Sequence, residues 1–385
     1  MMRRHVGLGL AVILGLAALL WLALPSRDEA PPTGSFAGLG ESAEGYAQAR
    51  PGTPLRFPED HGAHPDYRIE WWYLTANLED ERGEPLGIQW TLFRQALAPP
   101  GEADQEAPDS PWSSRQLWMA HAALSTGEEH FVAERFARGM HVANGRGQAG
   151  AEAAPFAAWL DHWRLESPAE RAEQEDFEHL VVSASDHYAG RDFGYRLALT
   201  AEGPLVLHGK GGFSQKSADG QGSIYYSQPF WRVKGEVEID GEVRAVSGRG
   251  WLDREWSSQL LGPEQRGWDW FSLHLEGGAK LMAFRLRGGG EGGEAFVSGS
   301  WIDADGTQTP LQAGDLDLQP LEYQAVAGRE VPTRWRLQLP ARGLDVTVNS
   351  RHPQRWMETA FPYWEGDVVV EGSHAGMGYL EMTGY

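Results

Sequence analysis

Cysteine is absent from the 385 residues of this chain. Its absence excludes disulfide bonds, thiolate metal sites, cysteine nucleophiles and thiol-linked lipid anchors. Basic residues are scarce as well: 33 Lys and Arg stand against 54 Asp and Glu, so the formal net charge is −21 at pH 7. A chain this acidic lacks the basic surface that binding to a phosphate backbone requires, and we predict no nucleic-acid partner.

Several motifs of catalysis and cofactor binding are also missing. The chain has no Gly-x-Ser-x-Gly elbow, phosphate-binding glycine loop, zinc-protease helix or dinucleotide fingerprint. We therefore expect its glycine-rich stretches to be turns, and we expect no cofactor. His61, His64 and Asp66 are close in sequence, but they have no further partner at a recognisable spacing. They indicate a metal site only weakly, and we predict none.

Long apolar runs are confined to the amino terminus. Arg3 and Arg4 precede a run over residues 6–24 that contains no charged residue. This pattern predicts that residues 1–25 are a signal peptide or a transmembrane anchor. No clear small-x-small cleavage site follows, which favours an anchor but leaves cleavage open. The basic residues before the run place the amino terminus in the cytoplasm, so the rest of the chain is expected to be exported, to the periplasm or cell envelope.

The remainder of the sequence predicts an all-β protein. Residues 26–54 are rich in Pro, Gly and Ala, lack periodicity and predict a flexible linker. From Leu55 onward, short alternating runs are separated by turn residues, as in β-strands, and helical periodicity is almost absent. The clearest hairpin pairs residues 70–78 with residues 86–94.

A second hairpin, residues 268–275 with 280–287, echoes the first, because both open on a tryptophan pair and both return strands carry Phe-Arg. This weak repeat predicts two related β-domains in tandem. The Gly/Ser-rich stretch 209–222 is the expected boundary, which gives an N-terminal domain over residues 55–220 and a C-terminal domain over residues 223–385. The strand spacing fits two antiparallel barrels of about eight strands, and such barrels commonly enclose one apolar ligand.

The segment 248–257 combines carboxylates with tryptophans. On a strand its residues divide into two faces, Trp251, Asp253 and Glu255 against Leu252, Arg254 and Trp256. Burial beside tryptophan raises the pKa of a carboxyl, which suits a general acid near neutral pH. The alternative interpretation is structural, with Asp253 and Glu255 paired to arginines such as Arg254 or Arg285.

Glu70 opens a similar aromatic strand. Trp71 and Tyr73 share one face of that strand, and Glu70 shares the other with Trp72. Core packing explains this pattern without any function, and His121 also alternates onto an interior face. The chain nevertheless has 17 tryptophans, which indicate aromatic-walled cores or an apolar cavity.

The chain resembles a known family at four stretches that follow one another in the expected order. They are Glu70-Trp-Trp-Tyr-Leu-Thr-Ala-Asn-Leu, Gly250-Trp-Leu-Asp-Arg-Glu-Trp, Gly267-Trp-Asp-Trp-Phe, and Trp364-Glu-Gly with Gly378-Tyr-Leu-Glu-Met-Thr-Gly-Tyr385. The family is the AttH-like group of predicted secreted hydrolases, related to carotenoid 1,2-hydratase. The resemblance runs from about residue 55 to the end of the chain and implies two lipocalin-like barrels.

For function, the resemblance implies two possibilities. Carotenoid hydratases protonate an isoprenoid double bond and add water, using the aspartate of a Tyr-x-Asp segment that Asp253 resembles. Trp251 stands in place of that tyrosine, Glu255 in place of an asparagine, and Tyr225-Tyr226 in place of a His-x-Trp segment. These departures make the chain more similar to the AttH-like branch, which is linked to ABC-transporter systems.

Three hypotheses follow from the sequence. The first is an exported protein that binds an elongated apolar ligand, a lipid or an isoprenoid. The expected ligand contacts are Glu70, Trp71, Trp72, Tyr73, His121, Tyr226, Trp251, Trp256, Trp268 and Trp270. The second is an enzyme, a hydratase or a hydrolase, with Asp253 or Glu255 as the general acid. The third is a non-enzymatic structural partner of a membrane transporter.

Overall fold

The computed structural model describes residues 43–100, 114–127, 129–138, 147–171, 177–261, 265–288 and 295–385. All of these residues belong to one compact unit. The predicted signal or anchor segment, residues 1–25, lies outside the described residues. Within the described residues, no helix is long and apolar enough to cross a membrane.

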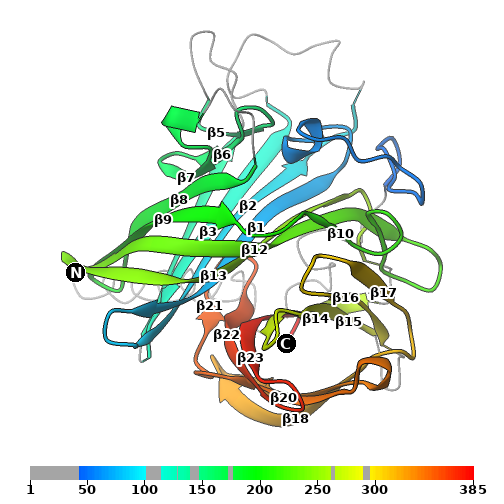
Figure 1. The fold of residues 1–385 in the computed structure, drawn as a ribbon. Coiled ribbons are helices and arrows are strands. Elements are labelled where there is room, and N and C mark those ends of the chain that lie inside the picture. Colours follow the sequence, from blue (N-terminus) through cyan, green and yellow to red (C-terminus); the bar gives the residue numbers. More distant parts are fainter. Residues whose placement is uncertain are drawn as a thin grey trace, which may run out of the picture. The chain divides into compact units, whose positions relative to one another are not determined.

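The all-β prediction is confirmed. Two antiparallel sheets make up almost all of the regular structure (Figure 1). The helices of the described residues are three 3-10 turns, η2 (Glu59–His61), η4 (Ala169–Arg171) and η5 (Pro340–Arg342). Figure 1 shows the second sheet, coloured from yellow to red, curving almost into a closed barrel, whereas the first sheet is more open.

The first sheet has the order β4-β3-β2-β1-β13-β12-β9-β8-β7-β6-β5, with β10 and β11 also paired to β12. Its strands are β1 (Ile69–Asp80), β2 (Pro85–Ala96), β3 (Gln116–Ser125), β4 (His130–Arg138), β5 (Ala149–Glu152), β6 (Ala157–Leu160), β7 (Trp163–Glu166), β8 (His179–Tyr188), β9 (Arg191–Ala201), β10 (Val206–Leu207), β11 (Phe213–Gln215), β12 (Gly222–Ile239) and β13 (Glu242–Ser257).

The second sheet has the order β17-β16-β15-β14-β23-β22-β20-β19-β18, with β21 paired to β22. Its strands are β14 (Gln265–Leu275), β15 (Lys280–Gly288), β16 (Phe296–Ile302), β17 (Gln308–Leu311), β18 (Asp317–Val326), β19 (Arg329–Leu339), β20 (Leu344–Ser350), β21 (Trp356–Met357), β22 (Tyr363–Gly372) and β23 (Gly376–Thr383). Both predicted hairpins are present, as β1–β2 and β14–β15.

The division between the sheets differs from the boundary predicted at residues 220–223. Strands β12 and β13 belong to the first sheet, so the chain passes from one sheet to the other between Ser257 and Gln265. The glycines of the 209–222 stretch serve turns: Gly209, Gly211 and Gly212 all have positive φ, and β11 then pairs with β12. A glycine-rich composition therefore marked a folded turn inside a sheet rather than a linker.

The end of the predicted linker, residues 26–54, also differs from expectation. Its described part packs against the body of the protein. Ala47 N–H donates to the Asp66 carbonyl at 2.9 Å, and the Ala47 carbonyl accepts from the Ser258 hydroxyl. Residue 47 is therefore fixed to the first sheet.

The three largest apolar clusters form most of the interior of the described residues. One fills the first sheet around Trp72, Trp90 and Trp231, and one fills the second sheet around Trp335 and Trp364. The third draws residues from both sheets: Ile69, Tyr73, Val206, Tyr225, Phe230, Trp251, Leu260, Leu261, Trp270, Met282, Phe284, Leu286, Ile302 and Tyr379. Because the residues of this shared cluster are buried, the two sheets meet through an apolar interior.

Because the two sheets approach closely at Gly87, we expect a larger side chain there to destabilise the fold. A Cβ added to Gly87 of β2 would lie 2.2 Å from the Oη of Tyr379 in β23. We expect Gly87→Ala to reduce the free energy of unfolding by about 1–3 kcal/mol, because the buried tyrosine must move. Urea unfolding measures this loss. Gly127→Ala is the control, since its Cβ meets only a histidine atom at 3.9 Å; equal losses in the two variants would contradict the prediction.

Candidate functional site

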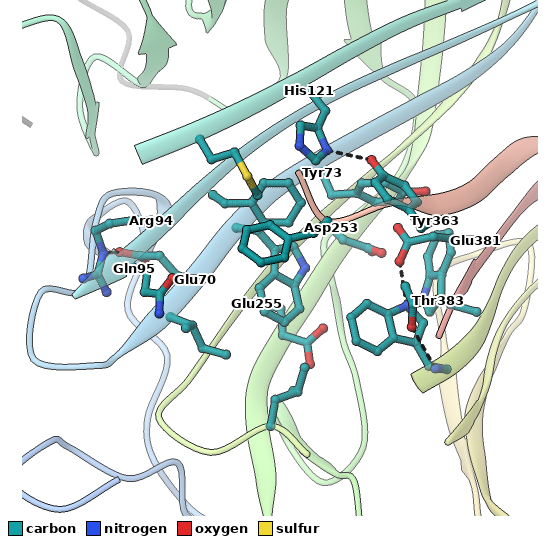
Figure 2. Close-up of a pocket in the computed structure, with 18 of the residues that line it drawn as sticks. Glu70, Tyr73, Arg94, Gln95, His121, Asp253, Glu255, Tyr363, Glu381 and Thr383 are labelled. Atoms are coloured by element: carbon teal, nitrogen blue, oxygen red, sulfur yellow. Dashed lines mark hydrogen bonds and ion pairs between the residues drawn. The ribbon is translucent and has the colours of Figure 1, made fainter. Parts of the chain in front are cut away.

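A cavity of about 130 Å³ lies where the two sheets meet. Strands β1, β2, β3 and β13 supply its walls from the first sheet, and β14, β15, β22 and β23 from the second. The apolar and aromatic lining comprises Ile69, Trp71, Tyr73, Phe93, Leu117, Met119, Leu260, Trp268, Trp270, Phe284, Leu286, Phe361 and Tyr363. Figure 2 shows carboxyl groups, among them Asp253 and Glu381, set among these rings.

The pairing of β1 with β13 places the first-sheet side chains. Tyr73 lies opposite Asp253, and Trp71 lies opposite Glu255. Because side chains alternate along a strand, these four point to the cavity while their neighbours point to the other face of the sheet. The predicted division of both strands into two faces is therefore found in the structure.

Asp253 is held by uncharged donors. Its Oδ2 accepts from Tyr225 Oη at 2.8 Å, and its Oδ1 accepts from Trp251 Nε1 at 2.7 Å and from the Ser227 hydroxyl. Burial raises the pKa of Asp253 to about 7, although these three hydrogen bonds lower it. The carboxyl can therefore donate a proton near neutral pH.

The predicted arginine bridges are made by other carboxylates. Arg254 pairs with Glu70 at 3.0 Å, and Arg285 lies 3.6 Å from Asp269. In the described part of the chain, no basic side chain forms an ion pair with Asp253. Glu255, in contrast, is paired with Lys216 at 2.9 Å and accepts from the Ser223 hydroxyl. The two carboxyls predicted together thus differ, because only Glu255 has a balancing cation.

Glu381 is a cavity carboxyl that the sequence analysis did not select. It accepts from Trp268 Nε1 at 2.6 Å, and burial, with added repulsion from Asp253 and Glu255, raises its pKa to about 7. The sequence feature that could have indicated Glu381 is its position as a single carboxylate between the apolar residues Leu380 and Met382. Its place in the cavity depends on the pairing of β23 with β14, which sequence alternation alone does not give.

Tyr363 and Glu365 of β22 were missed for the same reason. Tyr363 Oη lies 2.9 Å from His121 Nδ1, while His121 Nε2 lies 3.1 Å from Glu134. Burial lowers the pKa of His121, so it is neutral at the cavity wall. Tyr73 donates to Glu365 at 2.5 Å, and burial raises the pKa of Glu365 well above its usual value. These two contacts join the sheets beside the cavity.

Four predicted ligand contacts do not line the cavity, namely Trp72, Tyr226, Trp251 and Trp256. Trp251 lies behind Asp253 and donates to it. The other three lie on the opposite face of the first sheet, as alternation requires. Trp71, Tyr73, His121, Trp268 and Trp270 do line the cavity, together with Asp253 and Glu255. Glu70 borders the cavity as well, but its carboxylate is bonded to Arg94 and Arg254 on the opposite face of the sheet.

The opposite face is an ionic cluster around Glu70. Its carboxylate accepts from Arg94 and Arg254 and lies 3.1 Å from His64 Nδ1. The Arg254 guanidinium lies 3.9 Å from the ring centre of Trp72. Burial raises the pKa of Glu70, but the two arginines and His64 outweigh it and hold the pKa well below its usual value. With Asp60, which is bonded to His64, the cluster has two carboxylates and two guanidiniums, and Glu70 is already occupied by its own partners.

The histidines that suggested a metal site have other partners. His61 Nδ1 lies 2.7 Å from Tyr226 Oη, and His64 Nε2 lies 3.1 Å from Asp60. Across the described residues, no group of three His, Cys, Asp or Glu side chains is arranged to hold a metal ion.

Comparisons with known proteins agree with this architecture. A family model described as AttH-like matches residues 48–385. A crystal structure described as an AttH from Nitrosomonas europaea is 32% identical, with a TM-score of 0.73, and the match covers 88% of this chain and 99% of that one. No curated protein matches the chain.

Two less similar structures share the fold. Kievitone hydratase from Nectria haematococca is 16% identical with a TM-score of 0.60, covering 88% of this chain and 96% of that one. CghA, solved with Sch210972, is 12% identical with a TM-score of 0.52, covering 91% of this chain and 97% of that one.

The Glu70 cluster predicts a large effect on stability. Glu70→Gln leaves Arg94 and Arg254 buried without their counter-charge, so we expect a loss of roughly 3–5 kcal/mol in the free energy of unfolding. Glu79→Gln, at an exposed position of the same strand, is the matched control and should change little. Denaturant unfolding at neutral pH compares the two.

The same variant should reveal a pH dependence. Because the pKa of Glu70 is lowered in the folded chain, its ionisation stabilises the fold above the usual value of 4.5, and this stabilisation is lost as the pH falls below it. The stability difference between the parent chain and Glu70→Gln should therefore shrink in acid. A difference that stays constant from neutral pH to pH 3 would show that Glu70 acts by packing alone.

Proposed function

The chain belongs to the AttH-like family, and we propose that it binds one end of an elongated apolar ligand, a lipid or an isoprenoid, in the cavity between its sheets. The observation that carries this proposal is the cavity lining, in which aromatic and aliphatic side chains of both sheets surround a few polar groups. Burial of about 100 Å² of apolar ligand surface contributes roughly 2.5 kcal/mol.

The size of the cavity limits what enters it. At about 130 Å³ it resembles the apolar cavity of about 150 Å³ that admits a benzene ring. A single ring or a branched chain end fits, and the remainder of a longer ligand extends past the half-buried Gln95, Leu117 and Phe361 at the wall. The cavity therefore binds the end of a ligand, and the rest of the ligand lies outside it.

A second candidate function is favoured by Asp253. A protonated carboxyl in an apolar cavity can donate its proton to one carbon of a double bond, forming a C–H bond. The cation on the neighbouring carbon is stabilised by the ring faces of Tyr73 and Trp270, and the oxygen of a water molecule then adds to it. The added water releases one proton to Glu381 or to solvent, so the net reaction is addition of water.

The fold neighbours are consistent with this second candidate. Kievitone hydratase is a hydratase by name and shares the two-sheet fold at 16% identity. Export to the periplasm or cell envelope, and association with an ABC transporter, remain predictions of the sequence. So does the alternative in which the sheets serve only as a structural partner of a transporter.

Ligand binding can be tested with farnesol as an isoprenoid probe and the purified full chain. Farnesol should quench tryptophan fluorescence saturably, and Trp71→Ala should weaken binding about 10-fold or more, because Trp71 lines the cavity. Trp356→Ala is the control, since Trp356 is also half-buried but packs against the second-sheet core, away from the cavity lining. Equal affinity of the two variants, or absence of saturable quenching, would sink the binding proposal.

Hydration is tested by Asp253→Asn. The variant should bind farnesol as the parent chain does but incorporate no oxygen from isotopically labelled water, as measured by mass spectrometry. In the parent chain the rate should fall as the pH rises through about 7, since the acid must carry its proton. Glu255→Gln is the comparison: it should keep turnover, with the pH profile moved to lower pH, because it removes a negative charge that raises the pKa of Asp253. Unchanged turnover in Asp253→Asn would refute the acid role.

A further inference from the structure

We propose that His208 relays protons to Asp253 along a chain of hydrogen bonds that starts at Ser300, beside the half-buried Gln308. The inference rests on the proposed role of Asp253 as an acid and adds the route by which that acid regains its proton. His208 does not line the cavity, so it acts through Ser227 as a positioning residue.

The chain of contacts is continuous. Gln308 Nε2 lies 2.9 Å from Ser300 Oγ, which lies 2.9 Å from His208 Nδ1. His208 Nε2 lies 2.6 Å from Ser227 Oγ, and the Ser227 hydroxyl donates to Asp253 Oδ1. His208, Ser227 and Ser300 are completely buried, whereas Gln308 is half-buried. The contacts therefore lead from a partly exposed position to the cavity acid.

The contacts also pass from one sheet to the other. Gln308 and Ser300 belong to β17 and β16 of the second sheet, whereas Ser227 and Asp253 belong to β12 and β13 of the first. His208 follows β10 and lies between them. The relay therefore exists only when the two sheets are in contact.

The direction of each hydrogen bond follows from the protons available. Ser227 has one hydroxyl proton and donates it to Asp253, so its oxygen must accept from His208 Nε2. His208 Nδ1 then carries no proton and accepts from Ser300. Gln308 Nε2 can only donate, and it donates to Ser300. Every donor thus points towards Asp253 when that carboxyl is ionised.

His208 has the charge state that a relay needs. Burial, with a smaller effect from Lys216, lowers the pKa of His208 to about 3 and keeps it neutral. A neutral imidazole has one donor and one acceptor, so it can take a proton on one nitrogen while releasing one from the other. The ring of Tyr225 lies 4.2 Å from the imidazole centre. Asp253 itself is subject to the charges of Glu255 and Glu381.

One proton can pass without leaving a charge behind. After Asp253 gives its proton to the ligand, Ser227 passes its hydroxyl proton to Oδ1 and takes the Nε2 proton of His208. His208 takes the Ser300 hydroxyl proton at Nδ1. Ser300 regains a proton from a water molecule that enters beside the half-buried Gln308, because the Gln308 amide orients Ser300 but passes no proton on. This uptake balances the proton released by the added water. His208 is then protonated at Nδ1 instead of Nε2.

The proposal is tested by observing whether His208 changes its tautomer when Asp253 is protonated. We would titrate the full chain, labelled with ¹⁵N at histidine and with ¹³C at the aspartate carboxyls, through neutral pH. His208 should be protonated at Nε2 when Asp253 is ionised and at Nδ1 when Asp253 is protonated, with one shared midpoint. His208→Gln identifies the resonances, and Ser300→Ala, which shifts them, replaces it if that variant does not fold. A His208 that keeps one tautomer across the Asp253 midpoint overturns the proposal.

Matched variants separate the relay from general effects. Ser227→Ala should abolish the His208 transition while Asp253 still titrates, and persistence of the transition would refute the route. His130→Gln is the control, because His130 is bonded to Ser125 at 2.9 Å and also has a pKa lowered to about 3, but it has no bond to Asp253. No ligand is used, so failure here leaves farnesol binding intact, and failure of farnesol binding leaves this titration intact.

Discussion

The structure depends on the burial of both faces of one strand pair, β1 and β13. Alternation sends successive side chains of each strand to opposite faces, and β13 is buried on both faces from residue 250 to residue 257. Polar groups on either face must therefore find partners within the protein. The ionic cluster, the cavity and the contact between the sheets all follow from how the two faces meet this requirement.

The two faces treat carboxyl groups in different ways. On one face, Glu70 is balanced by two arginines, and its pKa is held low. On the other face, Asp253 and Glu381 have only neutral hydrogen-bond donors, and burial raises the pKa of each to about 7. The first arrangement stabilises charge and the second disfavours it. Adjacent residues of one strand, such as Asp253 and Arg254, thus serve the cavity on one face and the ionic cluster on the other.

Local sequence features predicted the all-β fold, the hairpins and the division of β1 and β13 into faces, because alternation and turn residues act over a few positions. They did not distinguish which face holds a cavity, so Trp72, Tyr226 and Trp256 were expected at the ligand but lie on the face opposite the cavity. Glu381 reaches the cavity because β23 pairs with β14, which is distant in sequence, and Tyr363 follows because β22 pairs with β23. The boundary was misplaced because glycine composition does not separate tight turns from linkers.

The apolar cluster shared by the two sheets has a consequence for how the chain folds and evolves. Neither sheet can complete its interior without the other, so the two halves should unfold in one cooperative transition despite the repeat in their hairpins. A recombined chain that took one sheet from a distant relative would have to match Tyr73 to Glu365 and His208 to Ser300 across the junction. Because the two sheets share this interior, we expect them to be inherited together.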